Sequence, residues 1–331
     1  MARLTSALVG IGVVVIAIAA GPSAATFSGK NGRISFARSV GNHTEIFSAN
    51  PDGSHKTRLT VSKPRDATSF ISDWSPDGQL IAFDSDRTDV DGRKHPVQIY
   101  VMAWNGTGVT QLTRGGGFHG FPGWSPSGAT IAIDSDWGKR SLNGIWIIPA
   151  SDPDGVTVAE AQRVTDARAG GAKFDSEPQF SPDGTTIVFS RFKSFGSSKS
   201  AIFRVNVDGT GLERLTNYRL NASHPDVSPD GQRITFDSGD TGLPGTKGDI
   251  YVMPIDGGKK RALTDTAPVE EDGPLTAAQN PVFSPNGRKI LYTQFREGGT
   301  DLIVMKVNGS GKHKILGGRR FPNKADWGTH P

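Results

Sequence analysis

One short signature recurs along the chain at nearly regular intervals. Five copies occur, at Trp74–Gly78, Trp124–Gly128, Phe180–Gly184, Val227–Gly231 and Phe283–Gly287. Each copy has an apolar residue, Ser-Pro, then Asp, Asn or Ser, and finally Gly, and a degenerate sixth copy covers Phe27–Gly32. The signature glycines lie 46 to 56 residues apart, which is typical of propeller blades. Because Pro suits the first corner of a turn and Gly accepts a positive φ, each copy predicts a tight turn.

The residues after each signature complete a unit of four strands. Alternating apolar residues, such as Ile81 and Phe83, predict a second strand. Nearly continuous apolar runs, such as Ile250–Met253, predict a third strand that is covered on both faces. An Asp-Gly or Asn-Gly pair, a strong hairpin signal, then leads into a fourth strand ending in Leu-Thr or Val-Thr. Six units predict an all-β fold, a six-bladed β-propeller of four-stranded blades.

The two ends of the chain predict how the ring closes. The first unit leaves almost no room for an inner strand of its own. The segment Ala325–Gly328, with the sequence Ala-Asp-Trp-Gly, repeats Ser72–Ser75, with the sequence Ser-Asp-Trp-Ser. We therefore expect the C-terminal strand to complete the first blade, since closure of the ring protects the sheet edges.

The first 25 residues have the features of a signal peptide. Arg3 precedes an apolar run from Leu8 to Ala20, and Ser23-Ala24-Ala25 fits a cleavage site between small residues. The alternative is an uncleaved membrane anchor, although 13 apolar residues fall short of the ~20 that span a bilayer. We predict a signal peptide at 1–25 and a propeller at 26–331. The protein is then exported to the periplasm, the exterior or the cell wall, with no stable membrane span after cleavage.

Composition excludes several kinds of site and partner. The chain has no cysteine, which excludes disulfides, thiolate metal sites and cysteine nucleophiles. The net charge is only +4, and basic residues are scattered apart from a cluster of Lys312, Lys314, Arg319, Arg320 and Lys324. We expect a solvated basic edge there, with attraction to anionic wall polymers as the alternative. No nucleic-acid-binding module is present, and we expect a monomer.

The repeat resembles that of a known family. Trp74–Phe83 reads W-S-P-D-G-Q-L-I-A-F, and with the later I-Y-V-M, Asx-Gly and L-T elements it is similar to the propeller repeat of TolB-like proteins over about residues 27–328. Similar blades occur in Tol transport components, peptidase propeller domains and some sugar-acting enzymes. Tol components also carry an N-terminal α/β domain. The first blade here follows the predicted leader directly, so we expect no such domain, and the resemblance leaves a Tol-system role open. A peptidase would need a Gly-x-Ser-x-Gly elbow, which the sequence lacks.

The residues at the start of each inner strand are expected to approach the channel. The polar ones are His119, Asp175, Glu177, His224, Gln279, Asn280 and Arg320. Histidines and carboxylates from several blades could converge there on a metal or a charged ligand. These positions do not match from blade to blade, which favours the alternative of a water-filled polar channel.

Other acidic residues suggest calcium but have a simpler interpretation. Asp84-Ser85-Asp86, Asp134-Ser135-Asp136 and Asp237–Asp240 follow second strands, and spaced aspartates suit calcium. The remaining units lack the pattern, so loop capping is favoured. The acidic stretch Glu270–Asp272 is expected to lie in a solvated loop.

Taken together, these features favour a non-catalytic, exported binding module. Its partner would be a protein or a polysaccharide of the cell envelope, held on one face of the ring and without a cofactor. The alternative is a metal-dependent enzyme acting on an acidic sugar, with a divalent metal in the channel or the loops. Seven histidines are too scattered for a Ser/His/Asp set to be chosen.

Overall fold

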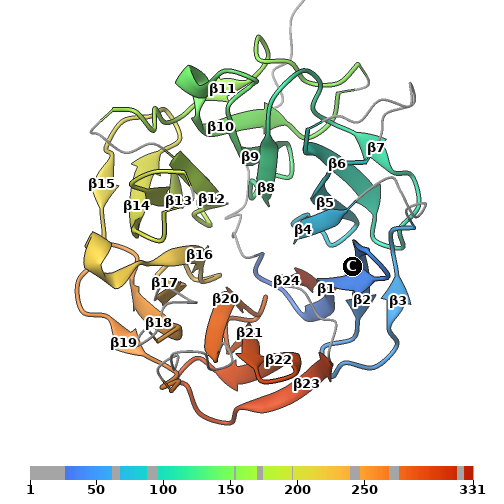
Figure 1. Ribbon diagram of the computed structural model, residues 1–331, viewed down its shortest axis with the longest axis vertical. Coiled ribbons are helices and arrows are strands. Elements are labelled where there is room, and N and C mark those ends of the chain that lie inside the picture. Colours follow the sequence, from blue (N-terminus) through green and yellow to red (C-terminus); the bar gives the residue numbers. More distant parts are fainter. Residues whose placement is uncertain are drawn as a thin grey trace, which may run out of the picture.

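The computed structural model describes residues 27–61, 68–87, 96–152, 154–169, 174–195, 197–238, 247–267, 276–318 and 324–330. Within these residues the chain forms six antiparallel four-stranded sheets, arranged as blades around a central axis (Figure 1). The predicted six-bladed propeller is confirmed. The predicted signal peptide, the stretch Glu270–Asp272 and Arg320 lie outside the described residues.

Each blade has four strand positions, counted from the axis outward. The inner strands are β24 (Ala325–Thr329), β4 (Ser69–Trp74), β8 (His119–Trp124), β12 (Phe174–Phe180), β16 (Ser223–Val227) and β20 (Ala277–Phe283). The second strands are β1 (Asn31–Val40), β5 (Leu80–Ser85), β9 (Thr130–Ser135), β13 (Thr186–Phe192), β17 (Arg233–Ser238) and β21 (Lys289–Arg296). The third strands are β2 (His43–Ala49), β6 (Gln98–Ala103), β10 (Gly144–Pro149), β14 (Ser200–Asn206), β18 (Asp249–Pro254) and β22 (Gly299–Lys306). The outer strands are β3 (Thr57–Arg58), β7 (Thr110–Gln111), β11 (Gln162–Arg163), β15 (Glu213–Arg214), β19 (Arg261–Ala262) and β23 (His313–Gly318).

The ring closes through the C-terminus, as predicted. Strand β24 pairs with β1, so blade 1 consists of β24, β1, β2 and β3, while blades 2 to 6 each use four consecutive strands. Trp327 of β24 is 3% exposed and packs with Phe36 of its own blade and Leu291 of blade 6. The C-terminal strand therefore joins the first and last blades into one core.

The outer strands are shorter than the sequence suggested. Five of the six comprise two residues, and in blades 1 to 5 the Leu-Thr or Val-Thr pair comes just after them. The threonine ends the strand because its hydroxyl accepts a hydrogen bond from a third-strand N–H. Thr60 accepts from Ile46 and Thr264 from Ile250, each at 2.9 Å. The repeated threonine thus satisfies a buried backbone donor within its own blade.

The two ends of the ring differ in their connections. The turn face carries the Ser-Pro-Asp-Gly and Asx-Gly turns. The loop face carries the connections between blades and between second and third strands, including the short 3-10 helices η1 (Arg140–Leu142) and η2 (Tyr218–Leu220). Across the described part of the chain, no helix is long and apolar enough to span a bilayer.

Candidate functional site at the loop-face mouth of the channel

A bulge interrupts the inner strands near the loop face. The pairing of β12 with β13 shifts register between Ser176 and Gln179, and β4, β8, β16 and β20 shift at the equivalent place. Non-glycine residues take positive φ there, such as 62° at Glu177 and 51° at His224. A proline follows each of these two residues, and it suits a bulge because it has no N–H to contribute to the ladder.

One residue from each blade occupies the same position in this arrangement. It lies three residues before the last apolar residue of the inner strand, and the six are Ile71, Phe121, Glu177, His224, Asn280 and Lys324, here called the bulge ring. All six line one hollow that is open to solvent. The ring therefore gathers six different side chains where the repeat is otherwise uniform.

Lys324 of blade 1 reaches across the mouth to Glu177 of blade 4, its opposite in the ring. Lys324 Nζ lies 3.6 Å from Glu177 Oε1 and 3.8 Å from the ring centroid of Phe121, a cation–π distance. Burial lowers the pKa of Lys324, while Glu177 and Asp84 act in the opposite direction. The contact between Lys324 and Glu177 therefore spans the mouth of the channel.

His224 is held between two carboxylates. Its Nε2 lies 2.9 Å from Glu177 Oε1 and its Nδ1 lies 2.8 Å from Asp237 Oδ2. Burial alone lowers the pKa of His224, but Asp237 and Glu177 outweigh it and raise the pKa to about 9. Burial disfavours ionised Glu177, yet His224 and Lys324 hold its pKa well below the usual range. At neutral pH, the mouth therefore holds a positively charged His224 in contact with a negatively charged Glu177.

The second strands supply acids that hold the bulges in place. Asp84 accepts from the N–H of Ile71 at 2.8 Å, and Asp237 accepts from the N–H of Asn280, in the next blade, at 2.7 Å. Burial raises the pKa of Asp84 to about 6 and that of Asp134, at the equivalent position, to about 8. Within the described residues, no three side chains are arranged to hold a metal ion. Asp84 and Asp237 thus act as backbone acceptors, whereas Asp134 accepts from Ser176 Oγ of the next blade.

Asn280 is the one bulge-ring residue whose buried polar side chain has no partner among the described residues. The residue is 5% exposed, and neither Oδ1 nor Nδ2 has a hydrogen-bond partner. An amide offers donors and an acceptor together, and leaving them unsatisfied costs about 1–3 kcal/mol. Asn280 therefore contributes to the wall of the hollow a side chain whose amide atoms are closed to solvent and have no partner among the described residues.

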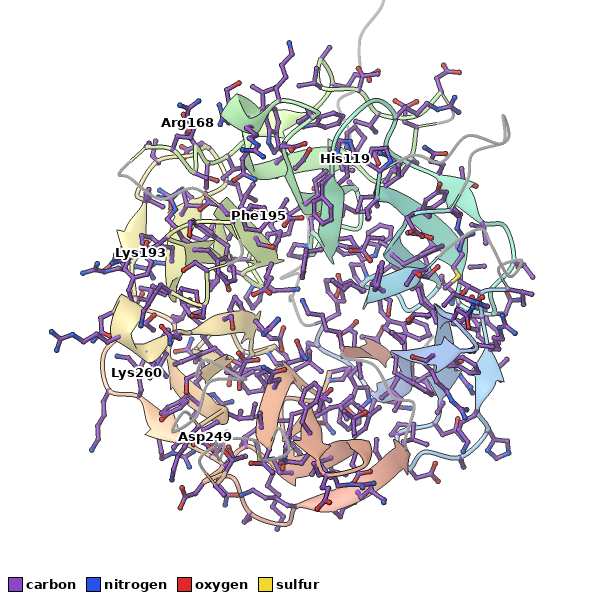
Figure 2. The ribbon with its side chains drawn as sticks, viewed as in Figure 1. His119, Arg168, Lys193, Phe195, Asp249 and Lys260 are labelled. Atoms are coloured by element: carbon purple, nitrogen blue, oxygen red, sulfur yellow. The ribbon has the colours of Figure 1, made fainter. Side chains whose placement is uncertain are left out.

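Three of the sequence-predicted residues meet in the hollow and three described ones do not. Glu177, His224 and Asn280 belong to the bulge ring. His119 lies away from the centre of the ring (Figure 2), beside Ser135 Oγ at 2.9 Å and against Trp137. Burial lowers the pKa of His119 to about 4.

Asp175 and Gln279 also lie off the hollow. Asp175 is fully buried and forms a two-pronged ion pair with Arg191 inside blade 4, at 2.6 and 2.7 Å. Gln279 is half-buried on β20, one residue before Asn280, and does not line the hollow.

Sequence reasoning missed the other half of the bulge ring. Lys324 stood out only as part of a basic cluster, and Ile71 and Phe121 did not stand out because they are apolar. Counting back three residues from the last apolar residue of each inner strand finds all six. That signal is positional and does not depend on residue type.

Comparison with known families identifies similar chains. The model of the TolB β-propeller domain family matches residues 155–330. An uncharacterized protein of Agrobacterium fabrum is 25% identical over 263 residues, covering 67% of this chain and 83% of that protein. A TolB homolog of Chlorobium luteolum is 29% identical over 184 residues, which are 56% of this chain and 37% of that protein.

Solved structures show the same fold. The crystal structure of TolB from Acinetobacter baumannii superposes with a TM-score of 0.67 at 20% identity. The superposition covers 90% of this chain and 67% of that one. At this identity the likeness concerns the arrangement of the blades and not the residues of the bulge ring.

Proposed function

The chain belongs to the TolB β-propeller family, and from this we propose that it is an exported, non-catalytic binding module of the cell envelope. Its partner is a protein or glycan that enters the loop-face mouth of the channel. The signal peptide predicted at residues 1–25 supports export. Family membership supports a binding role, and the partner's class is part of the proposal.

The unpartnered amide of Asn280 carries this proposal. A buried amide without partners is costly, and a ligand in the hollow would pair with this one once the side chain turns toward it, which accounts for its retention. Peptide groups and the N-acetyl groups of glycans both present a carbonyl and an N–H to such a side chain. Lys324, beside it, can donate further hydrogen bonds, since its contact with Glu177 is as long as 3.6 Å.

Affinity capture from envelope extract with matched variants tests the proposal. Asn280→Gly removes the amide, and glycine accepts the φ of 52° at this position. Asn221→Gly is the control, because Asn221 has a φ of 51°, is 9% exposed and lies outside the hollow. We expect partners held by the wild type and by Asn221→Gly to be lost from Asn280→Gly. Equal retention by all three proteins, or no retained partner at all, contradicts the proposal.

The alternative, a metal-dependent enzyme acting on an acidic sugar, is favoured by one observation, the convergence of Glu177 and His224. For His224 to ligate a metal it must lose a proton whose pKa is about 9 and give up one of its two carboxylate contacts. Metal analysis of the purified protein and melting with and without a chelator decide between the two. Bound metal with a chelator-dependent melting temperature supports the enzyme.

A further inference from the structure

The turn face of blades 5 and 6 carries an unusual concentration of positive charge. The residues are Lys259, Lys260, Arg288, Lys289, Lys306 and Lys312, here called the basic patch. Five are exposed and Lys260 is half-exposed at the outer edge of the ring (Figure 2). Arg261 links the two blades, since its guanidinium donates to the carbonyl oxygens of Val307 and Asn308 at 3.2 and 3.0 Å. In the described part of the chain, none of the six patch residues forms an ion pair with an acidic side chain.

Neither turn of blade 6 carries an acid, whereas blades 4 and 5 carry an aspartate in both turns. Asn286 replaces the aspartate of the Ser-Pro-Asp-Gly turn, and Asn308 replaces that of the Asp-Gly turn. Each asparagine still holds its turn together, because Asn286 accepts from Ser284 Oγ at 2.8 Å and Asn308 accepts from Ser310 N at 3.0 Å. The turns are thus preserved while their negative charge is absent.

Two lysines of the patch lie directly opposite each other. Lys289 begins β21, Lys306 ends β22, and the two are register partners. Like charges opposite each other across two strands destabilise a sheet. Among the described residues, neither lysine forms an ion pair, and both are exposed to solvent.

The position of the chain's start indicates which surface the turn face meets. Phe27, the first described residue, lies in a second hollow among Trp74, Trp124 and Trp327, at the turn-face end of the channel. The first described residues run from the centre of the ring to β1 (Figure 1). The apolar run Leu8–Ala20 ends seven residues earlier, a reach of about 25 Å at most. In the uncleaved form of the chain, a membrane holding that run would face the turn face.

An interfacial aromatic residue lies on the same face. Trp104, in the second turn of blade 2, is 41% exposed, and tryptophan favours the headgroup level of membranes. From charge complementarity and the place of the N-terminus, we propose that the turn face docks on an anionic lipid surface through the basic patch. Each cation near such a surface strengthens binding about five-fold at low salt.

Vesicle co-sedimentation of the full chain tests the proposal. Vesicles of phosphatidylcholine alone measure any binding by the apolar N-terminal run, and vesicles that also contain phosphatidylglycerol add the electrostatic part. We expect tighter binding to the anionic vesicles, lost at high salt. Lys289→Gln with Lys306→Gln should weaken it roughly ten- to thirty-fold without lowering stability, because it removes a like-charge pair. The control is Lys139→Gln with Arg140→Gln, an exposed pair on the loop face.

Three outcomes overturn the proposal. One is equal binding of the wild type to neutral and anionic vesicles. Another is an equal loss of anionic binding in the control and the patch variants. The third is patch-dependent binding to soluble polyphosphate without binding to vesicles, which assigns the patch to a phosphate polymer.

Discussion

The two sides of each inner strand differ in how much their residues vary from blade to blade. On the side that packs between blades, the last apolar residue is a Trp, Phe or Val in every blade, and it is buried. On the channel side, three residues earlier, the six blades present two apolar groups, an amide, an acid, an imidazole and an ammonium group. Packing between blades tolerates little variation because interiors are close-packed. The channel side has no such constraint, so its variation can serve binding.

The largest expected effect lies on the packed side. Deleting Asn323–Pro331 removes β24, and with it the buried Trp327 and the contacts that join blade 6 to blade 1. Loss of a buried tryptophan alone costs about 3–5 kcal/mol. We expect a sharply lower melting temperature by calorimetry. A truncated protein that melts like the intact one contradicts closure by this strand.

A buried ion pair inside blade 4 gives the next largest effect. Asp175→Ala leaves the guanidinium of Arg191, whose side chain is 4% exposed, without its partner. Breaking such a pair costs about 3–5 kcal/mol. Asp256→Ala is the control, because Asp256 pairs with Arg204 at the surface with its side chain 78% exposed, where a pair contributes about 1 kcal/mol or less. Similar losses in both variants, measured by urea unfolding, speak against a structural role for Asp175.

His224 and His119 should change the free energy of unfolding with pH in opposite directions. The pKa of His224 is raised to about 9 from 6.5, so its stabilisation is complete below about pH 6.5 and is lost as pH rises through 9. The pKa of His119 is lowered to about 4, so its effect appears as stability lost when pH falls from 6.5 through 4.

Unfolding measured across pH checks this contrast. His224→Gln should flatten the profile between pH 6.5 and 9, leaving the fall in stability up to about pH 8 that the raised pKa of Asp134 contributes. His119→Gln should flatten only the acid side. A profile of His224→Gln that keeps the full wild-type slope above pH 6.5 rules out the charged network at the mouth.

The smallest stability effect is expected at Asn280. Glycine relieves an unsatisfied amide and suits the positive φ, but it makes the unfolded chain more flexible. We expect the free energy of unfolding to change by less than about 1 kcal/mol. A loss of several kcal/mol would show that Asn280 supports the fold, and would remove it as a ligand contact.

Most of the fold, and half of the described site, could be predicted from the sequence. Local sequence signals were enough to predict the turns and strands, and the C-terminal Ala-Asp-Trp-Gly segment was enough to predict how the ring closes. Glu177, His224 and Asn280 were found because they are polar and begin inner strands. His119 and Asp175 have the same features, yet each lies two residues before the bulge-ring position of its blade, and they contact Ser135 and Arg191 inside the blade. Lys324 was missed because its meaning depends on Glu177, which lies on the opposite blade.

By itself, the sequence determined the number of blades, the order of their strands and the use of the C-terminus to close the ring. These follow from repetition, because each unit must bury the same apolar faces against its neighbours. Only the tertiary structure decided which side chains share the channel mouth, how Lys324 bridges it, and that Asn280 has no partner among the described residues. Those relations join residues of different blades that are far apart along the chain, and no spacing in the sequence specifies them.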